Sequence, residues 1–481
     1  MTSTFHGLET GKRAMFTQQS ALYTTGNNIA NANTPGYTRQ RVNFKESEAY
    51  PPAAMNRPQI PGQMGTGVAA GSIQRVREGF LDTQFRAENS KLGYHGSNSS
   101  ALAKLEDILN ETGKDSNGIS KVLNNFWQSL QDLSTSPENG GARAVVIEQG
   151  KAVADTFNYV HGTIEAYRQD LGSQIEVDQK HINTLLENID ALNKKIAEVE
   201  PHGYLPNNLY DERDRLVDEL SGYIDIKVEK VPSADDMLGN VKGVAEGYYI
   251  IKLGGNEIVN KDGYKTLDIQ KAGDPGKEYV TTISFGEFTY TAATLPQGKM
   301  KSMIENFGHG SEGNGTYSKL LADLDKLAND FAASVNAAHQ EGKLADGSNG
   351  VPLFQENAGA SGIYMVETDP AKLAPSSTGS AGDGSNARNM ADSFKGVMKG
   401  FESITGQLGV QAQFANRQKA STDVLRSAVE ESRLSVSTVS LDEEMMNMIK
   451  YQHAYNAAAR NITVVDEMLD KIINGMGTVG R

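Results

Sequence analysis

The chain has 481 residues, a length that predicts two to four domains rather than one. Its formal charge of −14, from 46 basic and 60 acidic residues, argues against a nucleic acid or an anionic membrane as partner, because both bind clustered lysine and arginine. Hydrophobic residues make up 38% and aromatic residues only 7%, so we expect large parts to be polar, elongated or packed by small residues. Without cysteine there is no disulfide, thiol chemistry or cysteine-bound metal.

The sequence carries no conventional membrane or secretion signal. No stretch approaches the roughly 20 consecutive apolar residues of a membrane-spanning helix. The opening letters, MTSTFHGLETGKRAMF, lack the charged start and apolar run of a secretory signal peptide. A cysteine-free chain of this length suits a protein that ends up outside the cell. If the protein is exported, we expect it to leave by another route.

Residues 3 to about 32 carry an apolar repeat of seven residues, which predicts a helix that packs on another helix. The repeat has one apolar column and a second column that begins apolar and continues without apolar side chains: Leu8, Met15, Leu22 and Ile29; then Phe5, Lys12, Gln19 and Gly26. An ordinary amphipathic surface helix is the alternative interpretation. We favour the helix-partnering role because the seven-residue register persists over four repeats.

The predicted helix ends in NNIANANTPGYTRQ, residues 27–40. Asparagine tolerates the left-handed conformation of a helix C-cap, so Asn31 and Asn33 are expected to end the helix. Pro35 pushes Thr34 towards extended geometry, and Gly36 allows a turn. The stretch therefore predicts a joint between the first helix and the segment that follows.

The chain between residues 33 and about 220 changes from extended to helical. Residues 33–75 are rich in proline and contain short β-like runs, so they predict loop and strand. Residues 77–220 predict helices, among them a coiled-coil-like helix with 4-3 spacing from Leu171 to Val199, interrupted by Asp178 and stopped by Pro201 and Gly203. A further helix is predicted over 211–220, with the charged run DERDR at its start as a solvated face.

The next part of the sequence predicts a β insertion between helices. Residues 222–305 alternate apolar and polar letters and are rich in β-branched and aromatic residues between Gly, Asp and Pro turns. A glycine-rich hinge is predicted at 307–317, a helix at 318–340, a polar connector at 341–392 and a helix from about 393 into the 430s.

The C-terminal region mirrors the N-terminal one. Its predicted helix has two columns at intervals of seven: Leu441, Met448, Tyr455, Ile462 and Leu469; then Met445, Gln452, Ala459, Asp466 and Ile473. Ser440 with Glu443 is a capping-box signature for its start, and Gly475 and Gly477 are expected to end it. Neither terminal helix can bury its apolar column alone. We therefore expect the two ends to pack on each other and on copies of themselves.

These elements predict a nested, multidomain α+β fold with both termini at one end of a long molecule. The terminal helices, 1–33 and 434–481, form a coiled-coil inner domain. Residues 34–221 and 306–433 form an elongated, mainly helical middle domain with a β/loop segment at 34–75. Residues 222–305 form a β-rich outer domain.

No motif predicts catalysis, a cofactor or a metal site. The eight histidines are scattered without HExxH spacing, so we expect solvated side chains. Gly308–Gly315 lacks the GK[ST] of a phosphate loop, and LADGSNG at 344–350 lacks the glutamate of a calcium loop. Asp235 and Asp236 are expected in a β-domain loop. An enzyme hidden in residues 222–305 would need clustered catalytic side chains, and that run has no histidine and only dispersed acids.

Both ends resemble one protein family. The stretch NNIANANTPGY resembles the N-terminal signature of bacterial flagellar rod, hook and hook-associated proteins, and the continuation GYTRQ is similar to the hook-associated members at the hook–filament junction. SLDEEM, KYQHAY and DEMLD resemble that family's C-terminal helix, with His453 where glutamine is common, and the interior Leu373–Ala387 also resembles it. The matching signature residues are Asn28, Asn31, Asn33, Pro35, Gly36 and Tyr37.

The resemblance implies a structural subunit that leaves the cell unfolded through the flagellar type III export apparatus, without a cleaved signal peptide. It implies a homo-oligomeric ring between the hook protein and a second junction protein, and a cytosolic export chaperone on the C-terminal helix. The terminal helices are expected to be disordered in the soluble monomer and to pack around a central channel after assembly. The predicted interface consists of Phe5, Leu8, Met15, Leu22, Ile29, Leu441, Met445, Met448, Tyr455, Ile462 and Leu469.

Two alternatives remain at this point. A hook or distal rod protein of the same family would share the NNIANANT-like text but is expected to lack GYTRQ and the DEEMMNMIKYQ form of the C-terminal helix. An adhesin carried on a coiled coil would predict an anchor or a conventional signal, and we find neither in the sequence.

Overall fold

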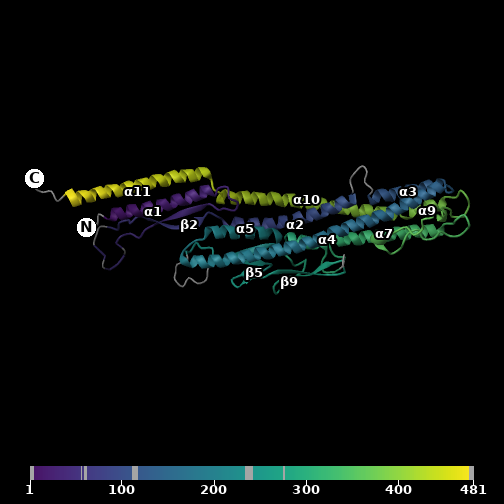
Figure 1. The fold of residues 1–481 in the computed structure, drawn as a ribbon, viewed down its shortest axis with the longest axis horizontal. Coiled ribbons are helices and arrows are strands. Elements are labelled where there is room, and N and C mark those ends of the chain that lie inside the picture. Colours follow the sequence, from purple (N-terminus) through teal and green to yellow (C-terminus); the bar gives the residue numbers. More distant parts are fainter. Residues whose placement is uncertain are drawn as a thin grey trace.

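The molecule is elongated, and both chain ends lie at the same end of it (Figure 1). The computed structural model describes residues 5–51, 53–55, 57–58, 62–110, 118–232, 242–274, 277–311 and 313–475. At the terminal end, α1 (Phe5–Ala30) and α11 (Leu441–Gly475) pack side by side, and the hairpin of β1 (Gln40–Glu46) and β2 (Val68–Arg75) lies along α1. The predicted pairing of the two terminal helices is confirmed.

The middle of the molecule is a bundle of long helices. Its helices are α2 (Gly79–Asn110), α3 (Ile119–Thr135), α4 (Gly140–Val199), η1 (Glu200–His202), α5 (Asn207–Tyr223), α6 (Lys299–Phe307), α7 (Thr316–Glu341), α8 (Gly359–Gly362), η2 (Pro370–Lys372), α9 (Ser385–Ser393) and α10 (Lys395–Ser437). Asn139 caps α4 by accepting from the N–H groups of Gly141 and Ala142, and Gly203, with φ of 78°, follows Pro201 at its other end. The predicted stop of this long helix is confirmed.

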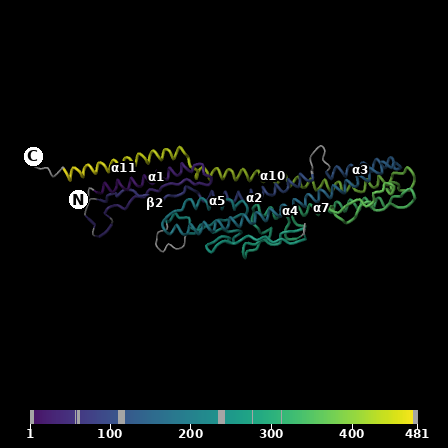
Figure 2. The backbone as a smooth tube through the Cα atoms, in the orientation of Figure 1, coloured from purple at the N-terminus to yellow at the C-terminus, as the bar shows by residue number. Residues whose placement is uncertain are grey.

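Helix α10 packs along α2, and α10 and α11 follow one another along one edge of the molecule (Figure 2). Two hydrophobic cores hold the bundle. At the end far from the termini, Phe126, Phe331, Phe354 and Phe394 form an aromatic cluster with ring centroids 5.0–6.1 Å apart. The second core lies where α4, α5 and α6 meet the β strands. Within the described ranges, no helix is both long and apolar enough to cross a membrane.

The β insertion forms two antiparallel sheets beside α4. Their orders are β3-β4-β5-β6 and β7-β8-β9, with bounds β3 (Ile226–Val231), β4 (Tyr248–Leu253), β5 (Asn256–Asn260), β6 (Gly263–Tyr264), β7 (Leu267–Ala272), β8 (Tyr279–Phe285) and β9 (Phe288–Tyr290). Tyr249, Ile251 and Leu253 alternate into the core as the period of two predicts. Asp235 and Asp236, which we expected in a loop here, lie outside the described residues.

Three segments differ from the expected boundaries. The predicted domain boundary at residue 434 lies inside α10, which continues to Ser437; Arg433 holds this last turn through Asp218. The glycine-rich stretch 307–317 is pinned rather than a free hinge, because His309 bridges to Val280 and Gly315 packs against Gly308. The polar connector 341–392 contains α8, η2 and α9.

The expectation that the histidines are solvated is wrong for His339, which is fully buried beneath the loops that follow α7. Its Nε2 accepts from the N–H of Ala374 at 2.9 Å, and its Nδ1 lies 2.6 Å from the carbonyl oxygen of Val351, to which it donates. Because Nε2 accepts a hydrogen bond, it carries no proton, so the imidazole ring is neutral. Burial lowers the pKa of His339, although the Val351 carbonyl and the charge of Glu367 oppose the shift.

A pH-dependent stability of the middle domain follows from His339. Because its folded pKa is lowered, its contribution is present above the unfolded value of about 6.5 and is lost as the pH falls, by at most about 1.4 kcal/mol per pH unit. Urea unfolding followed by the fluorescence of Trp127, the only tryptophan, is expected to show this loss between about pH 7 and 5. The His339→Gln variant should be less stable than the natural chain at neutral pH, but its stability should not show this additional loss between about pH 7 and 5. An unchanged slope in the variant would contradict the assignment.

Candidate assembly interface

The two terminal helices approach each other closely through small residues. A Cβ added at Gly11 would lie 3.0 Å from Cγ1 of Ile462, and one added at Gly7 would lie 3.4 Å from Cγ2 of Val465. The buried positions of α1 are therefore mostly small or polar: Gly11, Thr17, Ala21, Thr24, Thr25 and Asn28. This close approach of the two backbones leaves no room for large side chains at the centre of the contact, and the predicted apolar column of α1 is only half-buried in the single chain.

The predicted interface residues divide into two groups. Eight of them are half-buried in the single chain: Leu8, Met15, Leu22, Ile29, Met448, Tyr455, Ile462 and Leu469. Phe5, Leu441 and Met445 are exposed in the single chain. In the second column, Lys12, Gln452 and Asp466 are also exposed, as polar positions are expected to be.

A second apolar surface faces away from the contact of the two helices. Phe5, Phe16 and Tyr23 are each more than half exposed, and their spacings of 11 and 7 residues place them on one face of α1. The outer surface of α11 adds Met445, Met446, Ile449, Val464, Met468 and Ile472. The sequence analysis missed Phe16 and Tyr23 because neither falls in a heptad column. Apolar side chains gathered in this way mark an interaction surface.

Asn28 is the centre of a polar joint between α1, β1 and α11. Its side chain is only 1% exposed and makes four hydrogen bonds. Nδ2 donates to the carbonyl oxygen of Gln40 at 2.8 Å and to Oε2 of Glu444 at 3.1 Å. Oδ1 accepts from the N–H of Gln40 at 3.0 Å and from the hydroxyl of Tyr37 at 2.8 Å. The four contacts use the full hydrogen-bonding capacity of an asparagine side chain.

Arg39 completes this joint, which we call the elbow clasp: Asn28, Tyr37, Arg39, Gln40, Glu443 and Glu444. The Arg39 guanidinium contacts Oε2 of Glu443 and Oε1 of Glu444, each at 2.8 Å, and the main-chain N–H of Arg39 donates to the carbonyl oxygen of Ser437 at 2.9 Å. Glu444 is buried. The N-terminal and C-terminal signatures of the sequence therefore meet in one cluster, which contacts the end of α10 at Ser437 and the start of α11 at Glu443 and Glu444.

The environment of the clasp keeps Tyr37 protonated. Burial, with the charges of Asp211 and Glu444, raises the pKa of Tyr37 to about 12. The hydroxyl therefore remains a donor to Asn28 across the physiological range. The predicted capping box at Ser440 forms only in half: the N–H of Glu443 lies 3.5 Å from Oγ of Ser440, while the Glu443 carboxylate binds Arg39.

The rest of the asparagine-rich signature closes the end of α1 in a way that we did not predict. Within the described residues, neither Asn31 nor Asn33 has a positive φ, so the expected left-handed cap is wrong. Instead, the N–H and Nδ2 of Asn31 both donate to the carbonyl oxygen of Asn27, and Asn31 Oδ1 accepts from Thr34. The side chain thus gives a carbonyl of the last turn a second hydrogen bond and ties the end of the helix to the turn that follows. Gly36, with φ of 81°, makes the turn that was predicted for it.

Next to the elbow clasp lies a buried charge cluster that the sequence analysis missed. Its members come from β2, the loop after β2, α2, α5, α10 and the loop before β4: Arg75, Arg77, Arg86, Arg213, Arg433, Asp82, Asp211, Asp214, Asp218 and Glu246. The prediction that DERDR forms a solvated face is wrong, because Asp211, Arg213 and Asp214 are buried. Spacings of three and four residues between Asp211, Asp214 and Asp218 place these acids on one face of α5, a signal that could have revealed them.

Asp214 holds the cluster together. Its carboxylate lies 2.9 Å from Arg75 and 3.0 Å from both Arg77 and Arg86, and it accepts from the Tyr249 hydroxyl at 2.8 Å. Burial alone raises the pKa of Asp214, but the three guanidiniums outweigh it and hold the pKa well below its usual range.

The charge cluster and the elbow clasp are directly connected. Asp211 accepts from the N–H of Thr38 at 3.2 Å, and Asn207 donates to the side chain of Gln40 at 3.2 Å. The terminal helix pair is therefore attached to the middle bundle by buried polar contacts rather than by a free linker. Among the described residues, no group of histidine and acidic side chains has the arrangement of a metal site.

The chain ends pair and enclose a nested bundle with a β insertion, as the resemblance to flagellar proteins implied, and the comparisons with known proteins identify the class as a flagellar structural component. Residues 8–38 match the family model described as flagella basal body rod protein, and residues 430–475 match the flagellar basal body rod FlgEFG protein C-terminal model. Residues 102–354, more than half of the chain, match the model of the flagellar hook-associated protein FlgK helical domain. The chain belongs to the flagellar hook-associated protein 1 family.

The individual relatives support this membership. The chain is 40% identical to flagellar hook-associated protein 1 of Bacillus subtilis (strain 168) over the whole of both chains. It is 26% identical to the proteins of that name from Salmonella typhimurium and Escherichia coli (strain K12), over 70% of this chain and 57% of each relative. The solved structure of the flagellar hook junction protein FlgK from Burkholderia pseudomallei shares the fold, with a TM-score of 0.59 and 14% identity, over 74% of this chain and 100% of that one.

Proposed function

We propose that this chain is a structural subunit of the bacterial flagellum, that it forms the junction between hook and filament, and that it assembles through its terminal helices. The observation that carries the proposal is the pairing of α1 with α11, because the outer surface of this pair exposes large apolar side chains such as Phe16 and Tyr23. Full-length similarity to hook-associated protein 1 of Bacillus subtilis supports the position at the junction. The rod-type matches cover only the two ends of the chain, so a hook or distal rod protein is the weaker alternative.

The partners follow from the family rather than from contacts of this chain. We propose a homo-oligomeric ring with the hook protein on one side and a second junction protein on the other, and a cytosolic chaperone that holds α11 before export. Export through the flagellar type III apparatus without a cleaved signal peptide belongs to the same proposal. The function needs no catalysis and no cofactor, and the known relatives are structural flagellar proteins.

The ordering of the terminal pair is part of this proposal. The centre of the α1–α11 contact buries mainly small residues, such as Gly11 and Ala21, and few large apolar side chains. Burial of apolar area is the main stabilising term for a helix pair, so the pair is expected to be marginal in the isolated chain. Neighbouring copies that cover the outer apolar surface would supply the missing burial.

Deletion of the gene for this chain, followed by electron microscopy, tests the function. We expect hooks without filaments and monomeric filament protein in the medium, and normal filaments in the deletion strain would contradict the proposal. Complementation with Leu22→Asp or Ile462→Asp tests the interface, because a carboxylate would be forced into the partly apolar contact of α1 with α11. Both variants are expected to leave most cells without filaments. Lys12→Asp, at an exposed position of α1, is the matched control and should restore filaments.

A further inference from the structure

Helix α10 carries an apolar projection on the face that points away from the bundle. Val410 and Phe414 are 66% and 57% exposed, and their spacing of four residues places them together. Phe401, Leu408, Ala412 and Ala415 are buried towards the bundle, so Val410 and Phe414 take no part in the core. A Cβ added at the neighbouring Gly406 would have nothing within 4 Å. The two side chains are therefore largely exposed, with Val410 at the edge of a second groove that Glu106 of α2 also lines, and we call them the α10 knob.

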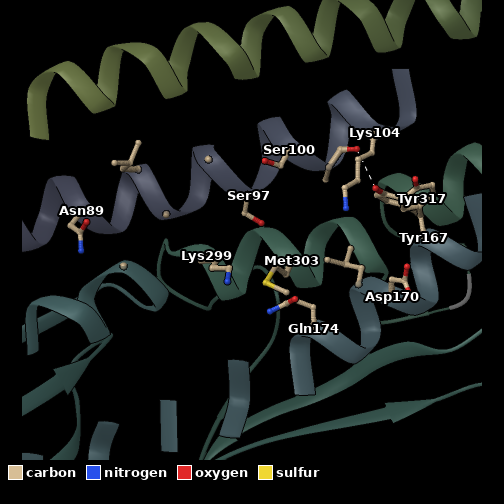
Figure 3. Close-up of a pocket in the computed structure, with 16 residues that line it drawn as sticks. Asn89, Ser97, Ser100, Lys104, Tyr167, Asp170, Gln174, Lys299, Met303 and Tyr317 are labelled. Atoms are coloured by element: carbon tan, nitrogen blue, oxygen red, sulfur yellow. Dashed lines mark hydrogen bonds between the residues drawn. The ribbon is translucent and has the colours of Figure 1, made fainter. Parts of the chain in front are cut away.

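On the other side of α2 lies a groove between α2, α4, α6 and α7, with a volume of about 600 Å³ (Figure 3). Leu92, Ala101, Leu171 and Met303 give it an apolar floor. Its α2 wall has no side chain larger than serine at the four positions Gly93, Gly96, Ser97 and Ser100. Lys104 and Asp170 lie at its polar rim, with Lys104 over the ring of Tyr167.

The two glycines of this wall have different explanations. An added Cβ at Gly93 would collide with the carbonyl oxygen of Gly222, so the crossing of α2 with α5 requires glycine there. An added Cβ at Gly96 would have nothing within 4 Å. Glycine inside a helix destabilises it relative to alanine, and nothing in the single chain accounts for it at this position. A molecule that enters the groove from outside would account for it.

We infer that the α10 knob of one copy of this chain docks in the α2–α4–α6 groove of the next copy. The inference rests on the proposed homo-oligomeric assembly and names a contact of the middle domain within it. Charge complementarity supports a second copy as the occupant: Arg417, one turn from Phe414, and Asp170 at the groove rim have no ion-pair partner among the described residues. Because the knob and the groove lie on different faces, the contact is heterologous and repeats from copy to copy, as a ring or a helix requires.

Cysteine cross-linking in isolated flagella tests this contact, because the natural chain has no cysteine. Gln413→Cys beside the knob and Ser97→Cys in the groove wall leave Val410 and Phe414 intact. A chain with both changes, treated with a short bismaleimide, is expected to give a ladder of multimers on denaturing gels, whereas each single change should give none. Val177→Cys with Ser97→Cys is the matched control, because Val177 is an exposed apolar position on another helix. Dimers from Gln413→Cys alone would mean that two α10 faces meet, and would overturn the inference.

A second pair of variants separates docking from folding. Gly96→Leu places a side chain in the groove, and because its Cβ would meet no atom of the single chain within 4 Å, the purified protein should unfold at the same or a higher temperature. Its incorporation into flagella is nevertheless expected to fall at least about tenfold, as it should for Phe414→Ser, if the knob is an energetic centre of the contact. Normal incorporation of Gly96→Leu would overturn the inference. Absence of even the natural chain from isolated flagella would instead overturn the proposed function.

Discussion

Replacement of Asp214 with alanine is expected to lower the free energy of unfolding by about 3 to 5 kcal/mol, the largest effect of any single change considered for this chain. Asp214 is 1% exposed and is the shared partner of Arg75, Arg77 and Arg86. After its removal each guanidinium keeps another carboxylate, Arg75 with Glu246, Arg77 with Asp82 and Arg86 with Asp218, but the largely buried cluster has lost the anion that all three share. The penalty comes from this unbalanced positive charge in a desolvated site as well as from the lost attraction.

The measurement is urea unfolding followed by circular dichroism. Glu212→Ala is the matched control on the same helix: its carboxylate pairs with Arg215 at the exposed surface, so the change should cost no more than about 0.5 kcal/mol. Because the folded pKa of Asp214 is lowered, its contribution is present above the unfolded value of about 3.9 and is lost only as the pH falls below it. Equal stabilities of the two variants at neutral pH would show that the charge cluster does not hold the bundle.

The second large effect is expected at the elbow clasp. Asn28→Ala removes two donors and two acceptor contacts at once, and leaves the main-chain groups of Gln40 and an oxygen of Glu444 buried with fewer partners. Unsatisfied buried polar groups cost about 1 to 3 kcal/mol each, so the docking of the terminal pair on the middle domain should weaken by about 2 to 4 kcal/mol. We expect a strain that carries only this variant to form hooks without filaments.

Asn33→Ala is the control for the clasp variant, because Asn33 belongs to the same signature but is exposed. It should restore filaments to the level of the natural chain. Glu444→Gln is expected to lie between the two variants, since the amide oxygen can still accept from Asn28 but the charge that pairs with Arg39 is lost. Loss of filaments with Asn33→Ala as severe as with Asn28→Ala would contradict the role of the clasp.

The parts of the fold that the sequence predicted are those with strong periodicity. Seven-residue spacing identified α1 and α11 and their pairing, alternation identified the β insertion, and Gly36 identified the turn after α1. Such patterns arise because each element must bury one face, whatever its partner is. The same patterns placed Leu22 and Ile462 on the faces that are half-buried in the structure. They did not reveal the small residues, such as Gly11, that determine how closely the two helices approach.

The polar centres could not be predicted in the same way. Asp214 and Asn28 have the composition of surface residues, and only the tertiary fold brings Arg75 and Glu444 to them from distant segments. His339 is buried for the same reason, since its partners Val351 and Ala374 belong to loops that return over α7. Buried polar side chains depend on partners far apart in the sequence, and a local pattern does not record those partners.

The central claim is that the terminal helices are the assembly element of this chain, and amide hydrogen exchange tests it most directly. Exchange would be measured by mass spectrometry on the purified chain and on the same chain in isolated hook structures. We expect peptides from α1 and α11 to exchange quickly in the purified chain and slowly after assembly, while peptides from the centre of α4 exchange slowly in both. Terminal peptides that exchange at the same rate in both states would contradict the account.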